Sequence, residues 1–286
     1  MKIIRTKKSI NHFLDKKRSK NLCIGFVPTM GALHSGHSSL IEKAKNECDL
    51  VIVSIFVNPK QFNNSNDFKH YPIKTNEDIN LLNSLAVDVL FLPKVEEVYS
   101  QEFVMPNYTI GALDSIMEGK FRPGHFNGVV EVVYRLFSII RPQKAYFGLK
   151  DFQQLAIIKK MSEEMHLHVE IIPCDTLREK DGLALSSRNL RLNEEERKNA
   201  LFIYQTLKEI QKIYMKFKPI ELKKKMTELF KNSPLKLEYI EFIDSSSFEV
   251  LEENWTDFSI ACIAAYAGEV RLIDNMSVNK RTLLDK

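Results

Sequence analysis

Residues 22–40 read LCIGFVPTMGALHSGHSSL. The apolar run at 22–28 predicts a short β-strand, and the run at 38–48 predicts a helix. Gly31 and Gly36 lie between them, where glycine lets the backbone turn tightly and approach a ligand closely. The segment therefore predicts a strand that turns directly into a helix, so that the helix begins at the carboxyl end of the strand.

The same alternation continues along the first part of the chain. Residues 50–57 form a continuous apolar run rich in β-branched residues, as expected for a strand buried on both faces. Further strands are predicted at 87–92, 145–149 and 168–173, and further helices at 77–85, 129–140 and 151–165. This order predicts an α/β fold, with a Rossmann-like parallel sheet and helices on both faces. Ligands of such sheets bind at the carboxyl ends of the strands.

The C-terminal part of the chain has a different pattern. A charge-rich helical region is predicted at 193–230, followed by apolar strand candidates at 237–244, 258–265 and 271–275. This order predicts a smaller α+β domain with antiparallel strands. We place the two domains at 1–178 and 179–286, with the boundary in a polar stretch.

The composition is typical of a cytoplasmic globular protein. Apolar residues make up 44% and charged residues 27% of the 286 residues, so a sizeable core is available. Much of the formal charge of +4 comes from residues 1–20, which favours a solvated basic face over a nucleic-acid site. The four cysteines form no CxxC pair and predict reduced thiols. The longest clean apolar run, at 50–57, is far shorter than the roughly 20 residues of a membrane helix.

Two histidines, His34 and His37, follow the first predicted strand. They are three residues apart, so in a helical turn they share a face. A helix N-terminus also offers free N–H groups and a positive dipole end, which suits phosphate. We interpret the pair as donors to one phosphate group, the alternative being surface or satisfied core residues. Zinc is a weaker alternative, because no third ligand lies nearby in the sequence.

Polar side chains also follow other predicted strands. Gln61 comes after the strand at 50–57, and its amide can both donate to and accept from an acid that carries hydroxyl groups. Lys150 and Gln154 come after the strand at 145–149, where a lysine can neutralise phosphate as a mobile point charge. Each residue alone could equally be a polar loop residue. Together they predict a site for an anionic acid and a phosphate compound.

Two further segments have the composition of site loops. Ser186 and Ser187 precede Arg188, and two hydroxyl donors beside a guanidinium make a cradle for an anion. The Gly- and Pro-rich segment 118–128 precedes a predicted helix and suits a site wall or lid. The alternatives are a solvated polar loop and a plain connection.

Five strings resemble, in order, the motifs of the pantothenate synthetase family. They are PTMGALHSGH at 28–37, SIFVNPKQF at 54–62 with Tyr71 and Pro72 downstream, EGKFRPGHFNG at 118–128, YFGLKDFQQ at 146–154 and REKDGLALSSRN at 178–189. The first is also similar to the histidine-containing turn of the nucleotidyltransferase superfamily that includes the class I aminoacyl-tRNA synthetases. The resemblance is dense over residues 20–195 and loose elsewhere.

The resemblance implies roles for the matching residues. It implies ATP binding by Met30, Gly31, His34, His37, Gly148, Lys150, Asp151, Leu185, Ser186, Ser187 and Arg188, with Lys150 on the phosphates and Asp151 on the ribose. It implies catalytic roles for His34, His37, Lys150, Ser186, Ser187 and Arg188. It implies a pantoate pocket of Met30, Phe56, Gln61, Val132, Val133 and Gln154, although packing in a helix core explains the two valines equally well. Asp78 matches a position near the nucleotide and magnesium.

The chain departs from the family pattern at two of these positions. Leu149 stands where the family usually has glutamate, so whatever that carboxylate does is absent here. Leu185 stands where the family usually has methionine, a mild change that conserves volume.

The resemblance implies ATP-dependent ligation of pantoate and β-alanine to pantothenate, on the route to coenzyme A. Pantoyl adenylate is the intermediate, and AMP and pyrophosphate are released. We expect Mg²⁺ with ATP, a homodimer in the cytoplasm, a C-terminal domain that acts as a lid, and no nucleic-acid or membrane partner. Three alternatives stay open: an adenylyltransferase of the same superfamily, a nucleotide-binding regulatory protein that has lost catalysis, and a nucleic-acid binder suggested only by the basic N-terminal segment.

Overall fold

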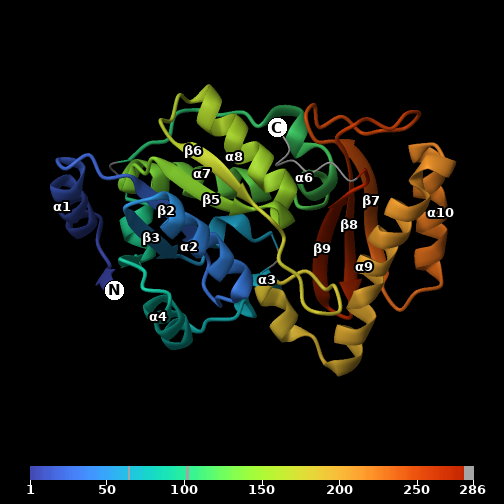
Figure 1. Cartoon of the computed structure of the whole chain (residues 1–286), viewed down its shortest axis with the longest axis horizontal. Helices are drawn as coiled ribbons and strands as arrows, with labels where there is room; N and C mark the ends of the chain where they lie inside the picture. The colour runs from blue at the N-terminus through green and yellow to red at the C-terminus, as the bar shows by residue number, and fades with distance from the viewer. Residues whose placement is uncertain (64, 101–102, 280–286) are drawn as a thin grey trace. The chain divides into compact units, whose positions relative to one another are not determined.

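The computed structural model describes residues 1–63, 65–100 and 103–279, and the chain divides into two compact units (Figure 1). Unit 1 is Met1–Asp175 and unit 2 is Thr176–Lys286. Unit 1 contains a six-stranded sheet and unit 2 a three-stranded sheet. The predicted fold class, a parallel α/β sheet followed by a smaller α+β part, is confirmed.

Unit 1 is built on a fully parallel sheet with the strand order β1-β4-β3-β2-β5-β6. The strands are β1 (Lys2–Ile4), β2 (Ile24–Thr29), β3 (Leu50–Ile55), β4 (Val89–Phe91), β5 (Lys144–Gly148) and β6 (Glu170–Cys174). From β2 the chain moves outward in one direction through β3 and β4, and β5 and β6 lie on the other side of β2. The order therefore reverses between β2 and β5, and ligands of open α/β sheets bind at the carboxyl ends of the strands at such a point.

The helices of unit 1 include those predicted from the sequence. They are α1 (Lys7–Arg18), α2 (Ser35–Glu47), α3 (Ser65–Lys69), α4 (Thr75–Ser84), α5 (Val95–Val98), α6 (Met117–Phe121), α7 (His125–Ile140) and α8 (Phe152–Glu164). The predictions for α2, α4, α7 and α8 are confirmed, although α7 begins at His125 and not at the predicted residue 129. The predicted strands correspond to β2 to β6. The short β1 and the basic helix α1 were not predicted.

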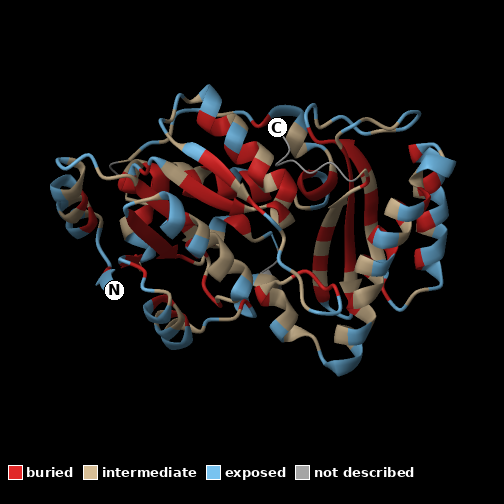
Figure 2. Cartoon of the chain, viewed as in Figure 1, coloured by how far each residue is buried: buried red, intermediate tan, exposed pale blue. Residues whose placement is uncertain are grey.

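Helices cover both faces of this sheet, and its strands are largely buried (Figure 2). Apolar side chains fill both interfaces. On one face, Ile41 of α2 and Leu82 of α4 are fully buried in a cluster with side chains of the strands. On the other face, Phe137 of α7 makes edge-on ring contacts with Phe26 of β2 and Phe147 of β5, at centroid distances of 6.3 Å each. The strands that end at the reversal point are thus fixed from both sides.

Unit 2 pairs two helices with an antiparallel sheet. The helices are α9 (Glu194–Ile213) and α10 (Pro219–Lys231), and the strands are β7 (Lys236–Asp244), β8 (Ser259–Ala267) and β9 (Val270–Ser277). The helical region predicted at 193–230 is therefore two helices, because a 3₁₀ turn at Tyr214–Lys216 ends the first and Pro219 starts the second. Leu207 and Phe242 are fully buried in its core.

Among the residues described, no helix combines the length and the apolar character needed to cross a membrane.

Candidate active site

The turn between β2 and α2 carries the two predicted histidines. His34 is the N-cap of α2, and its Nδ1 accepts a hydrogen bond from the backbone N–H of Gly36 at 3.1 Å. The Nδ1 of His37 accepts from the backbone N–H of His34 at 3.3 Å. Because both Nδ1 atoms accept, the ring proton of each neutral imidazole is on Nε2. The helix cap therefore fixes the tautomer of both histidines and makes each Nε2–H a donor.

Both histidines are neutral at neutral pH. Burial, followed by the positive charge of Lys150, lowers the pKa of His34 to about 4. Burial, followed by His34 and Lys150, lowers the pKa of His37 to about 3. The two rings lie 4.1 Å apart between centroids. The sequence interpretation as phosphate donors fits this geometry, but the local positive charge comes from Lys150 and not from the imidazoles.

Asp78 of α4 holds the same turn from the other side. Its two carboxylate oxygens accept from the backbone N–H groups of Ala32, at 2.9 Å, and Leu33, at 2.7 Å. Asp78 is 2% exposed, and burial raises its pKa although these two hydrogen bonds act in the opposite direction. Gly31 adopts φ +82, and a Cβ there would lie 3.0 Å from the carboxylate. The close approach explains why glycine occupies position 31. The two hydrogen bonds from the backbone show that Asp78 stabilises the turn. The predicted place of Asp78 near magnesium stays a prediction.

Gln61 follows β3 and is oriented by Asn58. Asn58 is 1% exposed; its Oδ1 accepts from the backbone N–H of Lys60 at 3.2 Å, and its Nδ2 donates to the carbonyl of Gly128 at 3.0 Å. The same Nδ2 donates to Gln61 Oε1 at 3.1 Å. The Nε2 of Gln61 then donates to the sulfur of Met30 at 2.8 Å. Two predicted pocket residues, Gln61 and Met30, are therefore in contact.

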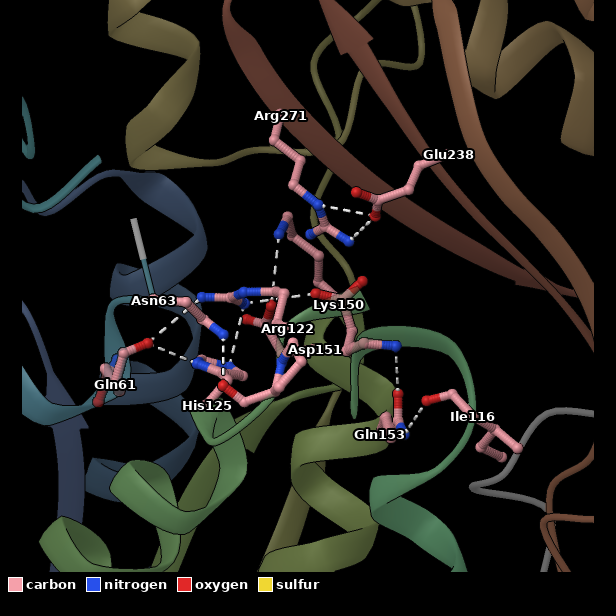
Figure 3. Close-up of polar contacts among 12 residues, drawn as sticks. Gln61, Asn63, Ile116, Arg122, His125, Lys150, Asp151, Gln153, Glu238 and Arg271 are labelled. Carbon is pink, nitrogen blue, oxygen red and sulfur yellow. Dashed lines mark hydrogen bonds and ion pairs between the residues drawn. The ribbon is translucent and has the colours of Figure 1, made fainter. Parts of the chain in front are cut away.

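The loop predicted to form a wall of the site contacts Gln61 directly (Figure 3). The carbonyl of Gln61 accepts from Nδ1 of His125 at 2.6 Å and from Arg122 at 3.5 Å. Arg122 also lies 3.3 Å from Glu118 and 3.0 Å from Nε2 of His125. Figure 3 shows the side chains of Arg122 and His125 pointing toward Gln61. Asn63 adds a bond from its amide to the carbonyl of Pro123 at 2.7 Å.

Other predicted pocket residues lie close to these elements. Phe56 is buried at the end of β3, with its ring 6.2 Å from that of Tyr99. Val132 and Val133 are both buried in α7. Their burial fits packing in the helix core as well as it fits a pocket wall.

The end of β5 carries the predicted phosphate and ribose residues. Gly148 ends the strand, and Leu149, Lys150 and Asp151 form a 3₁₀ turn before α8. Leu149 is buried, so an apolar side chain occupies the position where the sequence resemblance leads us to expect glutamate. Lys150 lies 3.5 Å from Asp151. The positive charge of Lys150, at the end of β5, lowers the pKa of both histidines in the β2–α2 turn. Lys150 and the histidines therefore interact between β2 and β5, where the strand order reverses.

Two adjacent glutamines at the start of α8 differ in their surroundings. Gln153 is 4% exposed; its Oε1 accepts from the backbone N–H of Glu118 at 2.9 Å, and its Nε2 donates to the carbonyls of Leu113 at 2.5 Å and Ile116 at 3.0 Å (Figure 3). Gln153 therefore fixes the loop that leads to residues 118–128. Gln154, the predicted pantoate residue, is only partly buried.

A cavity of about 420 Å³ lies beside the β2–α2 turn. Four of the predicted site residues line it, namely Met30, Gly31, Phe56 and Asp78. The other walls come from Ala32 in the turn, from Ile55 and Val57 at the end of β3, and from residues 73–75 and 92–96. The histidines, Gln61, Gln154, Val132 and Val133 do not contribute to its lining within the described ranges. The cavity is large enough for a small molecule and combines apolar walls with a few polar groups.

The predicted anion cradle belongs to unit 2. Ser186 is the N-cap of a 3₁₀ helix, Ser187–Arg191, and its Oγ accepts from the backbone N–H of Arg188 at 3.3 Å. Ser187 is 7% exposed, and Leu185 precedes the turn. Unit 2 also holds Arg271 and Glu238 in an ion pair, visible in Figure 3. The predicted site residues of unit 1 therefore lie at one edge of its sheet. The predicted residues 185–188 lie together in one turn of unit 2.

Sequence reasoning missed several residues that organise this site. Asn58, Gln153 and His125 lie within the motifs that resemble the family, but the sequence alone assigns them no role. Their importance comes from contacts with the backbone of distant segments, such as the carbonyls of Gly128, Ile116 and Gln61. The available signal was weak: each is a polar residue beside a predicted site residue or a glycine-rich loop.

Comparison with known proteins agrees with this geometry. The family model for pantoate-beta-alanine ligase matches residues 2–277 of the chain. The chain is 46% identical over 281 residues to the pantothenate synthetase of Thermodesulfovibrio yellowstonii, with 97% of this chain and 100% of the relative covered. It is 44% identical over 279 residues to that of Bacteroides thetaiotaomicron, covering 96% of this chain and 98% of the relative.

Solved structures agree over the same length. The pantothenate synthetase of Thermus thermophilus superposes with a TM-score of 0.90 at 37% identity, covering 98% of this chain and 100% of the other. The pantoate-beta-alanine ligase of Francisella tularensis, complexed with beta-gamma ATP and beta-alanine, superposes with a TM-score of 0.80 at 38% identity, covering 97% and 98%. Family model, full-length relatives and fold all agree: the chain belongs to the pantoate-beta-alanine ligase family.

Proposed function

We propose that this chain uses the turn of His34 and His37, beside Lys150, to form pantoyl adenylate. The reaction of the family is the ATP-dependent ligation of pantoate and β-alanine to pantothenate. In the first step the pantoate carboxylate attacks the α-phosphorus of ATP, and pyrophosphate leaves. In the second step the β-alanine amine attacks the acyl carbon, and AMP leaves as the amide bond forms.

One observation carries the assignment of the first step. The two Nδ1 atoms are occupied by the helix cap, so both histidines present fixed Nε2–H donors at the reversal point of the sheet. Phosphoryl and adenylyl transfer needs in-line positioning and charge stabilisation more than covalent help from the protein. Preorganised neutral donors with a lysine nearby supply both without reorganisation during the reaction.

The remaining predicted residues fit the same role, which is to position ATP and to stabilise charge on its phosphates. Lys150 neutralises phosphate, and Asp151, the next residue in the 3₁₀ turn, binds the ribose. Ser186, Ser187 and Arg188 of unit 2 supply further donors to the phosphates. We propose that unit 2 closes on unit 1 as a lid, because a hydrolysable adenylate requires a site that excludes water.

The acid pocket is proposed around Gln61 and Met30. The amide of Gln61 has a fixed direction because Asn58 donates to its Oε1, so Nε2 is the donor available to a hydroxyl or carboxylate oxygen. Phe56, Val132 and Val133 provide apolar contact area, and Gln154 offers a second amide.

A magnesium ion that arrives with ATP fits the donor groups present. No cluster of three histidine, cysteine, aspartate or glutamate residues suited to a metal occurs in the described part of the chain. Mg²⁺ commonly takes one or two carboxylates together with phosphates and water. Asp78 would be the carboxylate, since each of its oxygens keeps a lone pair beyond its bond to the backbone. When bound, the ion would neutralise phosphate charge. We further propose that the enzyme acts as a homodimer in the cytoplasm.

The test is AMP release from ATP and magnesium, with pantoate and β-alanine each omitted in turn. AMP formed only with both substrates supports the ligation and shows that Leu149 is compatible with catalysis. ATP binding without AMP under any combination would contradict the proposal and favour a regulatory nucleotide-binding protein. Retention of the adenylyl group on a phosphate ester product would instead favour an adenylyltransferase.

A further inference from the structure

A pair of cysteines lies at the edge of the sheet opposite to the candidate active site. Cys23 immediately precedes β2, and Cys48 is the C-cap of α2, so both lie near the amino ends of β2 and β3. Their sulfur atoms are 3.3 Å apart. Each is partly exposed, whereas Cys174 and Cys262 are 4% and 5% exposed. We propose that Cys23 and Cys48 are a reversible thiol pair that a peroxide oxidises to an intramolecular disulfide.

The backbone around the two cysteines brings them within disulfide range. The N–H groups of Asp49 and Leu50 donate to the carbonyl of Cys23 at 3.0 and 3.1 Å, and Ile24 is in register with Leu50. The same register places Asp49 beside Cys23, and Cys48 is the residue before Asp49. Strand spacing and rise place such diagonal Cα atoms about 6 Å apart, inside the range that a disulfide spans. With the sulfur atoms 3.3 Å apart, we expect rotation of the side chains, without movement of the strands, to be enough to form the bond.

The surroundings of Cys48 leave room for its sulfur and provide polar contacts. Gly25 has no side chain, and a Cβ there would lie 3.0 Å from the sulfur of Cys48. The sulfur also lies 3.3 Å from the hydroxyl of Tyr146, which donates to Glu47 at 3.1 Å. A chain of polar hydrogens thus runs from Cys23 through Cys48 and Tyr146 to a carboxylate. That chain can pass a proton away from the sulfurs when a thiol is oxidised.

The chemistry balances with a peroxide as the oxidant. One thiol loses its proton, and the thiolate attacks one oxygen of the peroxide. The O–O bond breaks, a sulfenic acid forms, and the leaving hydroxide takes up a proton to become water. The second thiol then attacks the sulfenic sulfur, the S–S bond forms, and a second water leaves. The protein loses two hydrogen atoms, and the peroxide is reduced to two waters. A thiol reductant reverses the reaction.

The disulfide would join the start of β2 to the end of α2. The enclosed loop carries His34 and His37, but the sulfurs lie at the opposite end of both elements from the histidines. Oxidation therefore closes the active-site element into a covalent loop without occupying the site. We expect the oxidised protein to keep its AMP-forming activity and to unfold at a higher temperature, because a cross-link restricts the unfolded chain.

The experiment treats the full chain with hydrogen peroxide, then denatures it in the presence of an alkylating reagent and maps the peptides by mass. Mildly alkaline buffer is used, because burial and the neighbouring Cys48 raise the pKa of the Cys23 thiol to about 11; Asp49 adds to this and Lys144 opposes it. The expected result is a cross-linked peptide that joins Cys23 to Cys48, with Cys174 and Cys262 alkylated. A reductant should restore four alkylated thiols.

Matched serine variants separate this pair from the other cysteines. Cys48→Ser and Cys23→Ser should each abolish the cross-link, and Cys262→Ser should retain it. AMP formation by each reduced variant shows that it is folded. Alkylation of all four thiols after peroxide treatment, over-oxidation of Cys23 without a cross-link, or cross-links only between molecules would overturn the proposal.

Discussion

At the scale of single residues, the site depends on which nitrogen of each histidine carries the proton. His34 and His37 both use Nδ1 to accept from the backbone, so the helix cap and the proposed substrate contact use different atoms of the same ring. Asparagine can replace the acceptor function of Nδ1, and glutamine can replace the donor function of Nε2. The oxygen of asparagine reaches the Nδ1 position, whereas the amide nitrogen of glutamine reaches the Nε2 position.

The first prediction uses this difference at His37. His37→Asn should keep the fold but lose the distal donor, and AMP formation should fall by roughly 10²- to 10³-fold, as for loss of one well-placed transition-state donor. His37→Gln should retain more activity, because a donor stays near the Nε2 position. Steady-state kcat and KM for ATP of both variants check this. An asparagine variant more active than the glutamine variant would show that the cap, and not the donor, is what the reaction needs.

The second prediction concerns stability at low pH. The pKa values of His34 and His37 are lowered from 6.5 to about 4 and about 3, so the folded protein binds fewer protons than the unfolded chain below pH 6.5. The stability that depends on the neutral histidines is therefore fully present above pH 6.5 and decreases as the pH falls through about 4 to about 3. Urea unfolding across this range checks the slope. His37→Gln has no imidazole at this position and should show a shallower decrease; an unchanged slope would contradict the assignment.

At the scale of elements, the proposed acid pocket depends on the contact between α7 and the loop after β3. An added Cβ at Gly128 would lie 2.3 Å from the carbonyl oxygen of Lys60, a backbone atom that cannot move alone. The carbonyl of Gly128 also accepts a hydrogen bond from Nδ2 of Asn58. The same Nδ2 donates to Gln61 and orients its side chain. Glycine at position 128 is therefore a condition for the geometry of Gln61.

The third prediction follows from this close approach. Gly128→Ala should destabilise the protein by about 1–3 kcal/mol through overpacking and should raise the KM for pantoate more than the KM for ATP. Gly148→Ala is the matched control for stability, since its φ is −74 and the nearest atom to an added Cβ is 4.0 Å away. Equal destabilisation by both substitutions would contradict the packing argument.

The elements themselves were largely predictable, and the polar network was not. The β2–turn–α2 segment follows from a local pattern of apolar residues and glycines, and the structure confirms it. Gln153 and Gln154 are neighbours of identical chemistry, and only the position of the distant residues 113–118 buries the first and leaves the second partly exposed. Likewise, Asn58 orients Gln61 through a carbonyl of α7, far away in the sequence. Side-chain patterns predict elements, but they do not predict which distant backbone groups will lie nearby.

At the scale of the whole molecule, each unit has its own buried core. Ile41 and Leu82 belong to the core of unit 1, and Leu207 and Phe242 to that of unit 2. The chain contains one tryptophan, Trp255, which lies in unit 2. Its ring packs 4.9 Å from that of Phe242, and its Nε1 donates to the carbonyl of Phe217 at 2.8 Å. Tryptophan fluorescence therefore reports on the packing of unit 2.

The fourth prediction uses this probe to test whether the proposed lid is an independent body. Leu207→Ala should remove about 2–5 kcal/mol from unit 2 and move the fluorescence transition in urea to lower concentration. Leu82→Ala, a truncation of the same size in the other core, should leave that transition in place while the loss of helical circular dichroism begins earlier. If Leu82→Ala moves the fluorescence transition as far as Leu207→Ala does, the units unfold as one cooperative body. A lid that opens and closes needs a connection weaker than either core, so that outcome would count against closure by unit 2 as the step that excludes water.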